Sequence, residues 1–269
     1  MSVRVIALLA TYNEERFIAG CLEHLFEQGV DVYLMDDSST DGTVAIAERY
    51  LHRGLLGIEI SSRGEYFDLQ GCLARKEQLA TTLEADWFMH VDADEIHVPP
   101  RSGAGLAAAF AEVDAQGYNV VNFQEATFIP TREAPDHDHP NFRQTMRWYY
   151  PFRIRFPYYM RAWKRQTTAI HLSDRGGHVL DFPGMRVCPE TYTLRHYICL
   201  SREHAIRKYA ARRFNPQELK DGWHGWRSRF DAETVRFPSQ AELRTYVSDD
   251  EMDFTCPRTT HYLDDFWAT

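Results

Sequence analysis

The sequence contains no long apolar run, since no stretch reaches the roughly 20 residues that a transmembrane helix needs. Residues 1–15 become charged too soon for a signal peptide or a membrane anchor, so we expect a cytoplasmic protein without a transmembrane segment. The five cysteines are scattered and odd in number, which favours reduced thiols over a disulfide framework. Acidic residues outnumber basic ones by 39 to 30, and the net charge of −9 argues against general nucleic-acid binding.

Several nucleotide-binding signatures are also missing from the loop after the first expected strand, where the sequence reads Ala10-Thr11-Tyr12-Asn13. This loop lacks the Gly-x-Gly-x-x-Gly of dinucleotide oxidoreductases. It also lacks the Gly-rich, Lys-containing loop of enzymes that make sugar nucleotides. Aspartyl-phosphate phosphatases place Asp-x-Asp after their first strand, whereas here that motif follows the fourth. The absences therefore count against these three enzyme classes.

Strand-like and helix-like apolar patterns alternate through the first hundred residues. Continuous apolar runs predict strands at 3–10, 30–35, 55–60 and 87–91, and helical spacing predicts helices at 17–28, 43–51 and 69–83. This alternation is typical of a doubly wound α/β sheet, whose functional loops follow the carboxyl ends of the strands. After Pro99-Pro100, one helix (about 106–116) and one strand (118–124) are expected to complete the sheet, and a further helix is expected at about 202–213.

Carboxylates gather where the expected strands end. Asp92 and Asp94 follow a buried strand, and in an extended segment alternate side chains point the same way. Both can then face one divalent cation, or one can take the metal while the other binds a sugar or ribose hydroxyl. Asn13-Glu14 and Asp36-Asp37 also follow strands. A polar turn would explain a lone Asp-x-Asp, but not the repetition at three strand ends.

Four segments together resemble the family 2 glycosyltransferases and their relatives with the A-type nucleotide-sugar fold (GT-A). They are Ala10-Thr11-Tyr12-Asn13-Glu14-Glu15, Met35-Asp36-Asp37-Ser38-Ser39-Thr40-Asp41-Gly42-Thr43, Ala74-Arg75-Lys76 and Val91-Asp92-Ala93-Asp94. The resemblance implies an α/β fold with a Rossmann-like, mostly parallel sheet flanked by helices. We expect a GT-A domain at 1–215, with a nucleotide-binding half at 1–100 and an acceptor and catalytic half at 101–215. A helical C-terminal extension is expected at 216–269.

The resemblance implies a hexosyltransferase-type enzyme. It would move a sugar from a UDP-, GDP- or dTDP-sugar donor to a glycan or lipid-linked acceptor, in cell-surface polysaccharide assembly. Charge builds on the departing diphosphate, and Mn²⁺ or Mg²⁺ can neutralise it as a Lewis acid. A metal-dependent phosphohydrolase and a catalytically degenerate nucleotide-sugar-binding or glycan-binding protein are the alternatives.

The resemblance also assigns site residues. The nucleotide-sugar-binding residues would be Thr11, Glu14, Asp37, Arg75 and Asp92. Asp37 would bind the base, although an Asx turn or helix cap is the alternative. Arg75 would approach the base or the phosphates, or else lie on a solvated helix face. Asp94 would bind the metal together with His196, because family members commonly add a late His to the metal site; a hydrogen-bonded core His is the alternative.

The catalytic base departs from the family pattern. An inverting member usually offers a Glu-Asp pair ahead of a helix, where one carboxylate deprotonates the acceptor hydroxyl. No such pair occurs between Asn119 and His196. Asp174 is the best-placed substitute, with a surface turn as its alternative role. His178 follows two glycines that permit close backbone approach, so we expect it to contact the donor sugar or the acceptor.

One segment, His139 to Ser173, has no Asp or Glu but has seven Lys or Arg and nine aromatic residues. Aromatic faces stack on sugar rings, and Arg side chains bind phosphates or carboxylates. We therefore expect this segment to line the acceptor side of the cleft, with Trp163-Lys164-Arg165 nearest the chemistry and an anionic acceptor. A peripheral contact with the inner face of a membrane through Trp148-Tyr149-Tyr150 is one alternative. A core filled by these aromatics is the other.

Overall fold

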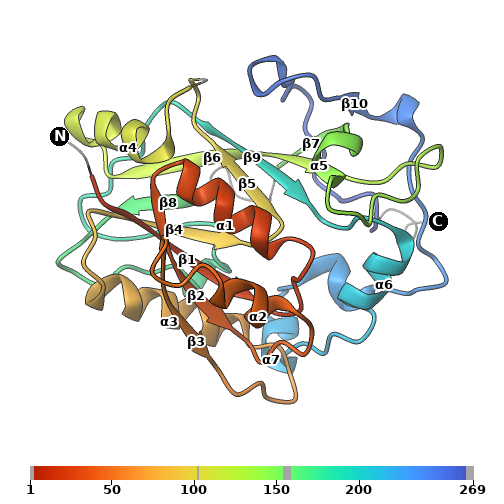
Figure 1. The fold of residues 1–269 in the computed structure, drawn as a ribbon, viewed down its shortest axis with the longest axis horizontal. Helices are drawn as coiled ribbons and strands as arrows, with labels where there is room; N and C mark the ends of the chain where they lie inside the picture. The colour runs from red at the N-terminus through yellow and green to blue at the C-terminus, as the bar shows by residue number, and fades with distance from the viewer. Residues whose placement is uncertain (1–2, 102, 154–158, 265–269) are drawn as a thin grey trace.

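The computed structural model describes residues 3–101, 103–153 and 159–264 of the chain. Its centre is a sheet in which four neighbouring strands are parallel (Figure 1). In spatial order these are β3 (Leu55–Ile60), β2 (Val30–Asp36), β1 (Val5–Thr11) and β4 (Trp87–Asp92). The near-continuous apolar sequences of β1 and β4 suit this position, because both faces of each strand are buried. The strand that leads to the carboxylates therefore lies inside the sheet, as expected.

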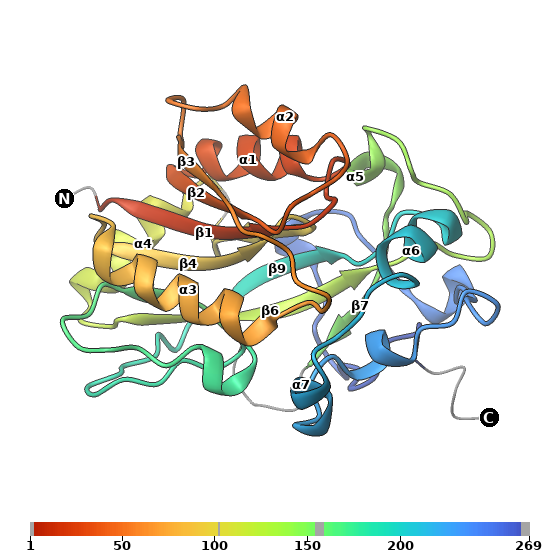
Figure 2. The same cartoon turned by 90° about the horizontal axis from the view of Figure 1, so that it is seen from below.

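Helices cover both faces of this sheet (Figure 2). Three of them pack into one hydrophobic cluster on one face: α1 (Ile18–Glu27), α2 (Thr43–Glu48) and α4 (Leu106–Ala115). The helix α3 (Leu69–Thr82) packs on the opposite face. Local sequence sets the helix ends: Asp68 caps α3 by accepting a hydrogen bond of 2.9 Å from the backbone N–H of Gly71, and Gly29 follows α1 with a φ of +76°. The mixed α/β architecture predicted from the sequence is confirmed.

The second half of the chain adds more strands than the single one expected. The strand β6 (Val120–Phe128) pairs first with β8 (Met160–Lys164), which joins it to β4 in antiparallel fashion. Its later residues pair with β7 (Trp148–Phe152) and with β9 (Tyr192–Tyr197). The strand β9 also pairs with β5 (Glu95–Val98), which follows β4 after a two-residue turn. These strands are short and rich in aromatic residues, so the apolar pattern did not reveal them.

The remaining elements lie beyond the carboxyl ends of β1 and β4 or at the surface (Figure 2). They are the helices α5 (Phe142–Thr145), α6 (Arg202–Tyr209) and α7 (Pro216–Lys220), the strand β10 (Arg244–Thr245), and the 3₁₀ turns η1 (Ser173–Arg175), η2 (Gly225–Arg229), η3 (Gln240–Glu242) and η4 (Asp249–Glu251). No helix in the described ranges is both long and apolar enough to cross a bilayer.

The C-terminal extension shares a core with the rest of the chain. Its apolar residues, among them Trp226, Val235 and Leu263, pack into one cluster with residues of β7 and α6. In addition, the strand β10 of the extension pairs directly with β7 in the sheet. The extension contains little regular helix, since α7 is only five residues long.

We predict that Trp226→Ala lowers the free energy of unfolding of the whole protein by about 3–5 kcal/mol, the usual range for deleting a buried Trp side chain. Trp226 is 4% exposed, and its ring centroid lies 4.8 Å from that of Tyr209 in α6. Urea denaturation should show one cooperative transition. Leu219→Ala, in the same extension but 41% exposed, is the control and should change stability by about 0.5 kcal/mol at most. A separate early transition in the Trp226 variant would mean that the extension folds independently.

Candidate active site

A cavity of about 620 Å³ opens at the carboxyl ends of β1, β2 and β4. This volume is typical of sites that bind small organic ligands. Strand ends form one side of it, α3 a second, and α6 with the extension a third. Its lining includes these residues predicted from the sequence: Thr11, Glu14, Asp37, Arg75, Asp92, Asp94, His178 and His196.

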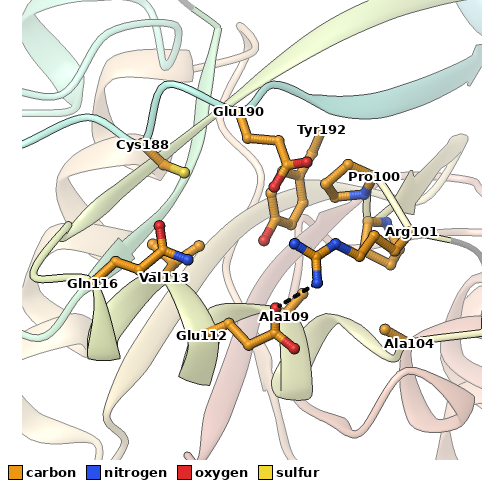
Figure 3. Close-up of a pocket in the computed structure, with 11 residues that line it drawn as sticks. Pro100, Arg101, Ala104, Ala109, Glu112, Val113, Gln116, Cys188, Glu190 and Tyr192 are labelled. Carbon is orange, nitrogen blue, oxygen red and sulfur yellow. Dashed lines mark hydrogen bonds and ion pairs between the residues drawn. The ribbon is translucent and has the colours of Figure 1, made fainter.

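A second hollow, between α4 and the start of β9, is far smaller (Figure 3). It holds about 20 Å³, roughly the space of one water molecule. An exposed ion pair between Arg101 and Glu112, with a nitrogen–oxygen distance of 3.4 Å, lies beside it. This hollow is too small to bind an organic ligand.

Two adjacent aspartates after β2 have different roles. Asp36 is 1% exposed, and its carboxylate accepts hydrogen bonds from the Thr11 hydroxyl at 2.9 Å and from the Ser39 hydroxyl at 2.6 Å. Asp36 therefore braces the loops that follow β1 and β2. Asp37 instead lines the cavity, where its carboxylate is paired with Arg63, whose guanidinium lies 3.6 Å from the centroid of the Tyr12 ring.

Arg75 projects from α3 into the same end of the cavity. Its guanidinium donates two hydrogen bonds to the Glu59 carboxylate, of 2.9 and 2.7 Å. The hydrogen bonds from Arg75 lower the pKa of Glu59, so this carboxyl stays ionised. Arg75 thus lines the cavity while its side chain remains 38% exposed, so it lies both at the site and on a solvated face of α3.

A row of alternating charges crosses the deepest part of the cavity. The Lys208 ammonium lies 3.2 Å from a carboxylate oxygen of Glu14 and 2.7 Å from one of Asp94. Nε2 of His196 lies 3.4 Å from the same Asp94 oxygen, and its Nδ1 lies 2.7 Å from the Glu125 carboxylate. The pairing of β5 with β9 brings His196 close to Asp94. It places Glu95 directly opposite His196, and Asp94 is the residue that precedes Glu95.

Burial and pairing set the protonation of this row. Burial disfavours the charged form of Asp94, but Lys208 and His196 outweigh it and hold its pKa well below the usual range. Burial also opposes the charge on His196, yet Asp94 and Glu125 raise its pKa to about 10. Burial raises the pKa of Glu14 to about 7. Lys208 opposes this rise only in part, because its ammonium lies nearer to Asp94 than to Glu14.

Asp92 and Asp94 do not face one common position. The strand β4 ends at Asp92, so the alternation of side chains stops before Asp94, which lies in the turn to β5. The Asp92 carboxylate is 44% exposed to the cavity and lies 3.5 Å from Arg161, which is itself 2% exposed and paired with Glu95. Burial raises the pKa of Glu95 to about 8 despite Arg161. Of the two arrangements expected for the Asp-x-Asp motif, the one with separate roles fits this geometry.

A divalent cation fits the site only in part. No group of three or more His, Cys, Asp or Glu in the described ranges is arranged to hold a metal ion. However, Mg²⁺ is usually bound by one or two carboxylates together with phosphate oxygens and water. The contact of His196 with Glu125 also matches the usual support of a metal-binding His by an outer carboxylate. Asp94 and His196 therefore fit a metal shared with a phosphate ligand, provided that Lys208 moves and that the protonated His196 ring gives up its Nε2 proton.

His178 and Asp174, the two predicted catalytic residues, lie in different places. The His178 ring stacks on Tyr159 at 5.0 Å and lines the cavity. Burial lowers its pKa to about 3, so the ring is neutral and suited to hydrogen bonding rather than to taking up protons. A Cβ at Gly177 would lie 3.1 Å from Leu73, so the glycine before His178 allows the backbone to pass close to Leu73. Asp174 is 65% exposed, is 3.6 Å from His171 and does not line the cavity, which contradicts its assignment as the base.

The predicted acceptor residues Trp163, Lys164 and Arg165 are not at the cavity. The strand β8 runs antiparallel to β4, so Arg161 lies toward the carboxylate end, while Lys164 is paired with Trp87 at the opposite end. Trp163 is fully buried beside Phe88. This placement contradicts the acceptor assignment. The described part of the segment supplies core aromatics and, at the cavity, Tyr159 and Arg161. Its residues 154–158 lie outside the described ranges.

The structure adds cations that sequence reasoning did not assign to the site. They are Lys76, Arg161, Lys208, Arg212 and Arg227. His224 also lines the cavity, with its Nε2 only 2.6 Å from the buried carboxylate of Glu218. One signal was available: Lys208 and Arg212 lie in a basic section of an acidic chain, although only Lys208 is in α6, which ends at Tyr209.

Comparisons with known proteins give one family and several distant relatives. Residues 7–172 match the family model of glycosyl transferase family 2. The lipopolysaccharide core biosynthesis glycosyltransferase LpsC of Rhizobium meliloti (strain 1021) is 29% identical over 89 residues, which are 33% of this chain and 31% of LpsC. The match thus spans less than two thirds of that relative.

Among solved structures, S. aureus TarS 1–349 in complex with UDP has a TM-score of 0.46 and 16% identity, over 73% of this chain and 61% of that one. The same TarS segment in complex with UDP-GlcNAc has a TM-score of 0.45 and 15% identity, over 72% of this chain and 58% of the other.

We predict that Arg161→Met destabilises the protein by about 3–5 kcal/mol above pH 8, where the buried Glu95 carboxyl is ionised in the wild type and would lose its cation. Arg101→Met is the matched control: its ion pair with Glu112 is 68% and 58% exposed, so the loss should be at most about 1 kcal/mol. Urea denaturation of both variants measures the difference. Equal losses would show that the pair between Arg161 and Glu95 is not desolvated.

Proposed function

Because this chain belongs to glycosyl transferase family 2, we propose that it moves a hexose from a nucleotide-sugar donor to a glycan or glycoconjugate acceptor. One observation carries the proposal: a single cavity of about 620 Å³ combines Asp37, Asp92 and Asp94 with several buried cations at the carboxyl end of a parallel sheet. In open α/β sheets, this edge is where ligands bind.

The nucleoside would bind between the loops that follow β1 and β2. The Asp37 carboxylate can accept hydrogen bonds from N–H groups of a base, and its pairing with Arg63 fixes its direction. Thr11, Glu14 and Arg75 line the same part of the cavity. UDP, GDP and dTDP sugars are the candidate donors.

The diphosphate would lie against the cations. Arg161, Lys208, Arg212 and Arg227 line the cavity and present fixed positive charge to a leaving group that gains negative charge as the sugar departs. Charges that are already in place in a partly desolvated site stabilise such a transition state strongly. A divalent cation, Mn²⁺ or Mg²⁺, is part of the proposal: Asp94 and His196 would hold it, and when bound it supplies Lewis-acid charge to the diphosphate.

The sugar would lie between Asp92 and His178. The Asp92 carboxylate is 44% exposed, and the neutral ring of His178 can exchange hydrogen bonds with hydroxyl groups. The similarity of part of the chain to a lipopolysaccharide core glycosyltransferase supports a role in cell-surface polysaccharide assembly.

We predict that Asp37→Ala weakens binding of the cognate nucleoside diphosphate by roughly tenfold to a hundredfold, as for loss of a hydrogen bond to a charged group. Isothermal titration with UDP, GDP and dTDP measures this change. Asp174→Ala is the matched control, because that carboxylate is 65% exposed and outside the cavity, so its affinity should equal that of the wild type. Unchanged binding in the Asp37 variant would remove this residue from the nucleoside site.

We further predict that Asp94→Ala lowers donor hydrolysis and sugar transfer by roughly a thousandfold, because neighbouring hydroxyl groups cannot replace the lost charge. The assay uses a panel of donors with Mn²⁺, Mg²⁺ or EDTA. Near-normal activity of the variant in EDTA would refute the metal assignment. If the wild type neither hydrolyses nor transfers any donor of the panel, the proposed function is wrong.

A further inference from the structure

Lys208 extends from the last turn of α6 and places its ammonium between two buried carboxylates. The nitrogen lies 2.7 Å from Oδ2 of Asp94 and 3.2 Å from Oε1 of Glu14. The side chain is only 8% exposed, and the nitrogen lies 5.0 Å from the centroid of the Phe17 ring. Asp94 thus already has a cation, supplied by the chain itself, on the oxygen that also faces His196.

This position is incompatible with a metal ion on the same oxygen. A divalent cation binds carboxylate oxygens at about 2.0–2.2 Å. An ammonium 2.7 Å from that oxygen would then crowd the metal and repel its charge. Asp94 can therefore hold either Lys208 or a divalent cation through this oxygen at one time.

The Lys208 ammonium could bind a second partner in the cavity, the diphosphate of a donor. Its four-carbon stem is flexible, and an ammonium binds phosphate as a point charge. Arg212 and Arg227 line the same cavity, so a diphosphate drawn to these cations would lie within the space that Lys208 shares. The negative charge of a diphosphate can then replace the contact with Asp94.

We propose that Lys208 is the resident cation of the Asp94 site, which it releases to a divalent cation only when the donor diphosphate binds. This inference rests on the proposed function. Before the donor arrives, the ammonium neutralises Asp94 and Glu14. On binding, it moves to the diphosphate and becomes a positioning residue for the leaving group, while Asp94 is freed for the metal.

The proposal makes metal and nucleotide binding depend on one another. Each ligand must raise the affinity for the other by the same factor, because coupling between two binding equilibria is reciprocal. A lysine that stayed in place would repel the metal equally with and without nucleotide, so only a lysine that moves makes the effect of its charge on metal affinity depend on nucleotide.

The test is titration of free Mn²⁺, followed by electron paramagnetic resonance, with and without saturating UDP, or GDP or dTDP if one of these binds better. Lys208→Gln keeps hydrogen-bond donors for both carboxylates but removes the charge, and Lys208→Arg keeps the charge. Lys164→Gln is the control for loss of one lysine charge, because it removes an ion pair with Asp114 that is more exposed and lies away from the cavity. Thermal unfolding of each variant checks that it is folded.

We expect wild type, Lys208→Arg and Lys164→Gln to bind Mn²⁺ weakly without nucleotide, and Lys208→Gln to bind it about tenfold more tightly or better. Saturating nucleotide should then raise the Mn²⁺ affinity more in the wild type than in Lys208→Gln. Equal Mn²⁺ affinities of Lys208→Gln and the wild type would overturn the inference. Tight binding of Mn²⁺ by the wild type without nucleotide would overturn it too, and this measurement does not depend on any variant. Failure of all three nucleotides to bind would instead overturn the proposed function, and the inference with it.

Discussion

Alternation of charge is the constraint on which the cavity depends. Glu14, Lys208, Asp94, His196 and Glu125 follow one another in a buried row in which every acid has a cation beside it. Removing one member would leave a buried charge unpaired and would destabilise the fold by several kcal/mol, so the five residues depend on one another. They come from separate elements: the loop after β1, α6, the turn between β4 and β5, β9 and β6. The row therefore joins both halves of the chain at one edge of the sheet.

The same constraint explains how an acidic protein can offer a site for an anion. The chain carries a net charge of −9, yet its second half places Arg161, Lys208, Arg212 and Arg227 around one cavity. Arg161 is buried and the other three are partly buried, and acids beside the cavity balance part of their charge. The second half thus supplies these four cations, and the first half supplies Asp37, Asp92 and Asp94.

The fold of the first hundred residues was largely predictable, and the residues singled out within them line one cavity, while their roles remain predictions. The strand ends carry Thr11, Asp37 and Asp92 to one edge because side-chain periodicity and strand length are local properties. The prediction was wrong where it depended on strand direction. Trp163 and Lys164 have the composition of a sugar-binding surface, but β8 runs antiparallel to β4 and carries them to the far end, leaving Arg161 at the cavity.

By itself, the sequence determined the doubly wound half of the sheet, its helices and the carboxylates at its edge, because apolar spacing and helix-terminating residues act over a few positions. Tertiary structure alone decided which charges meet. Glu125 and His196 are 71 residues apart, and Lys208 and Glu14 are 194 apart. Such contacts follow from the bend of β6, the register of β5 against β9 and the docking of α6. No local pattern encodes them, since the same residues on a strand of opposite direction would face the other end of the sheet.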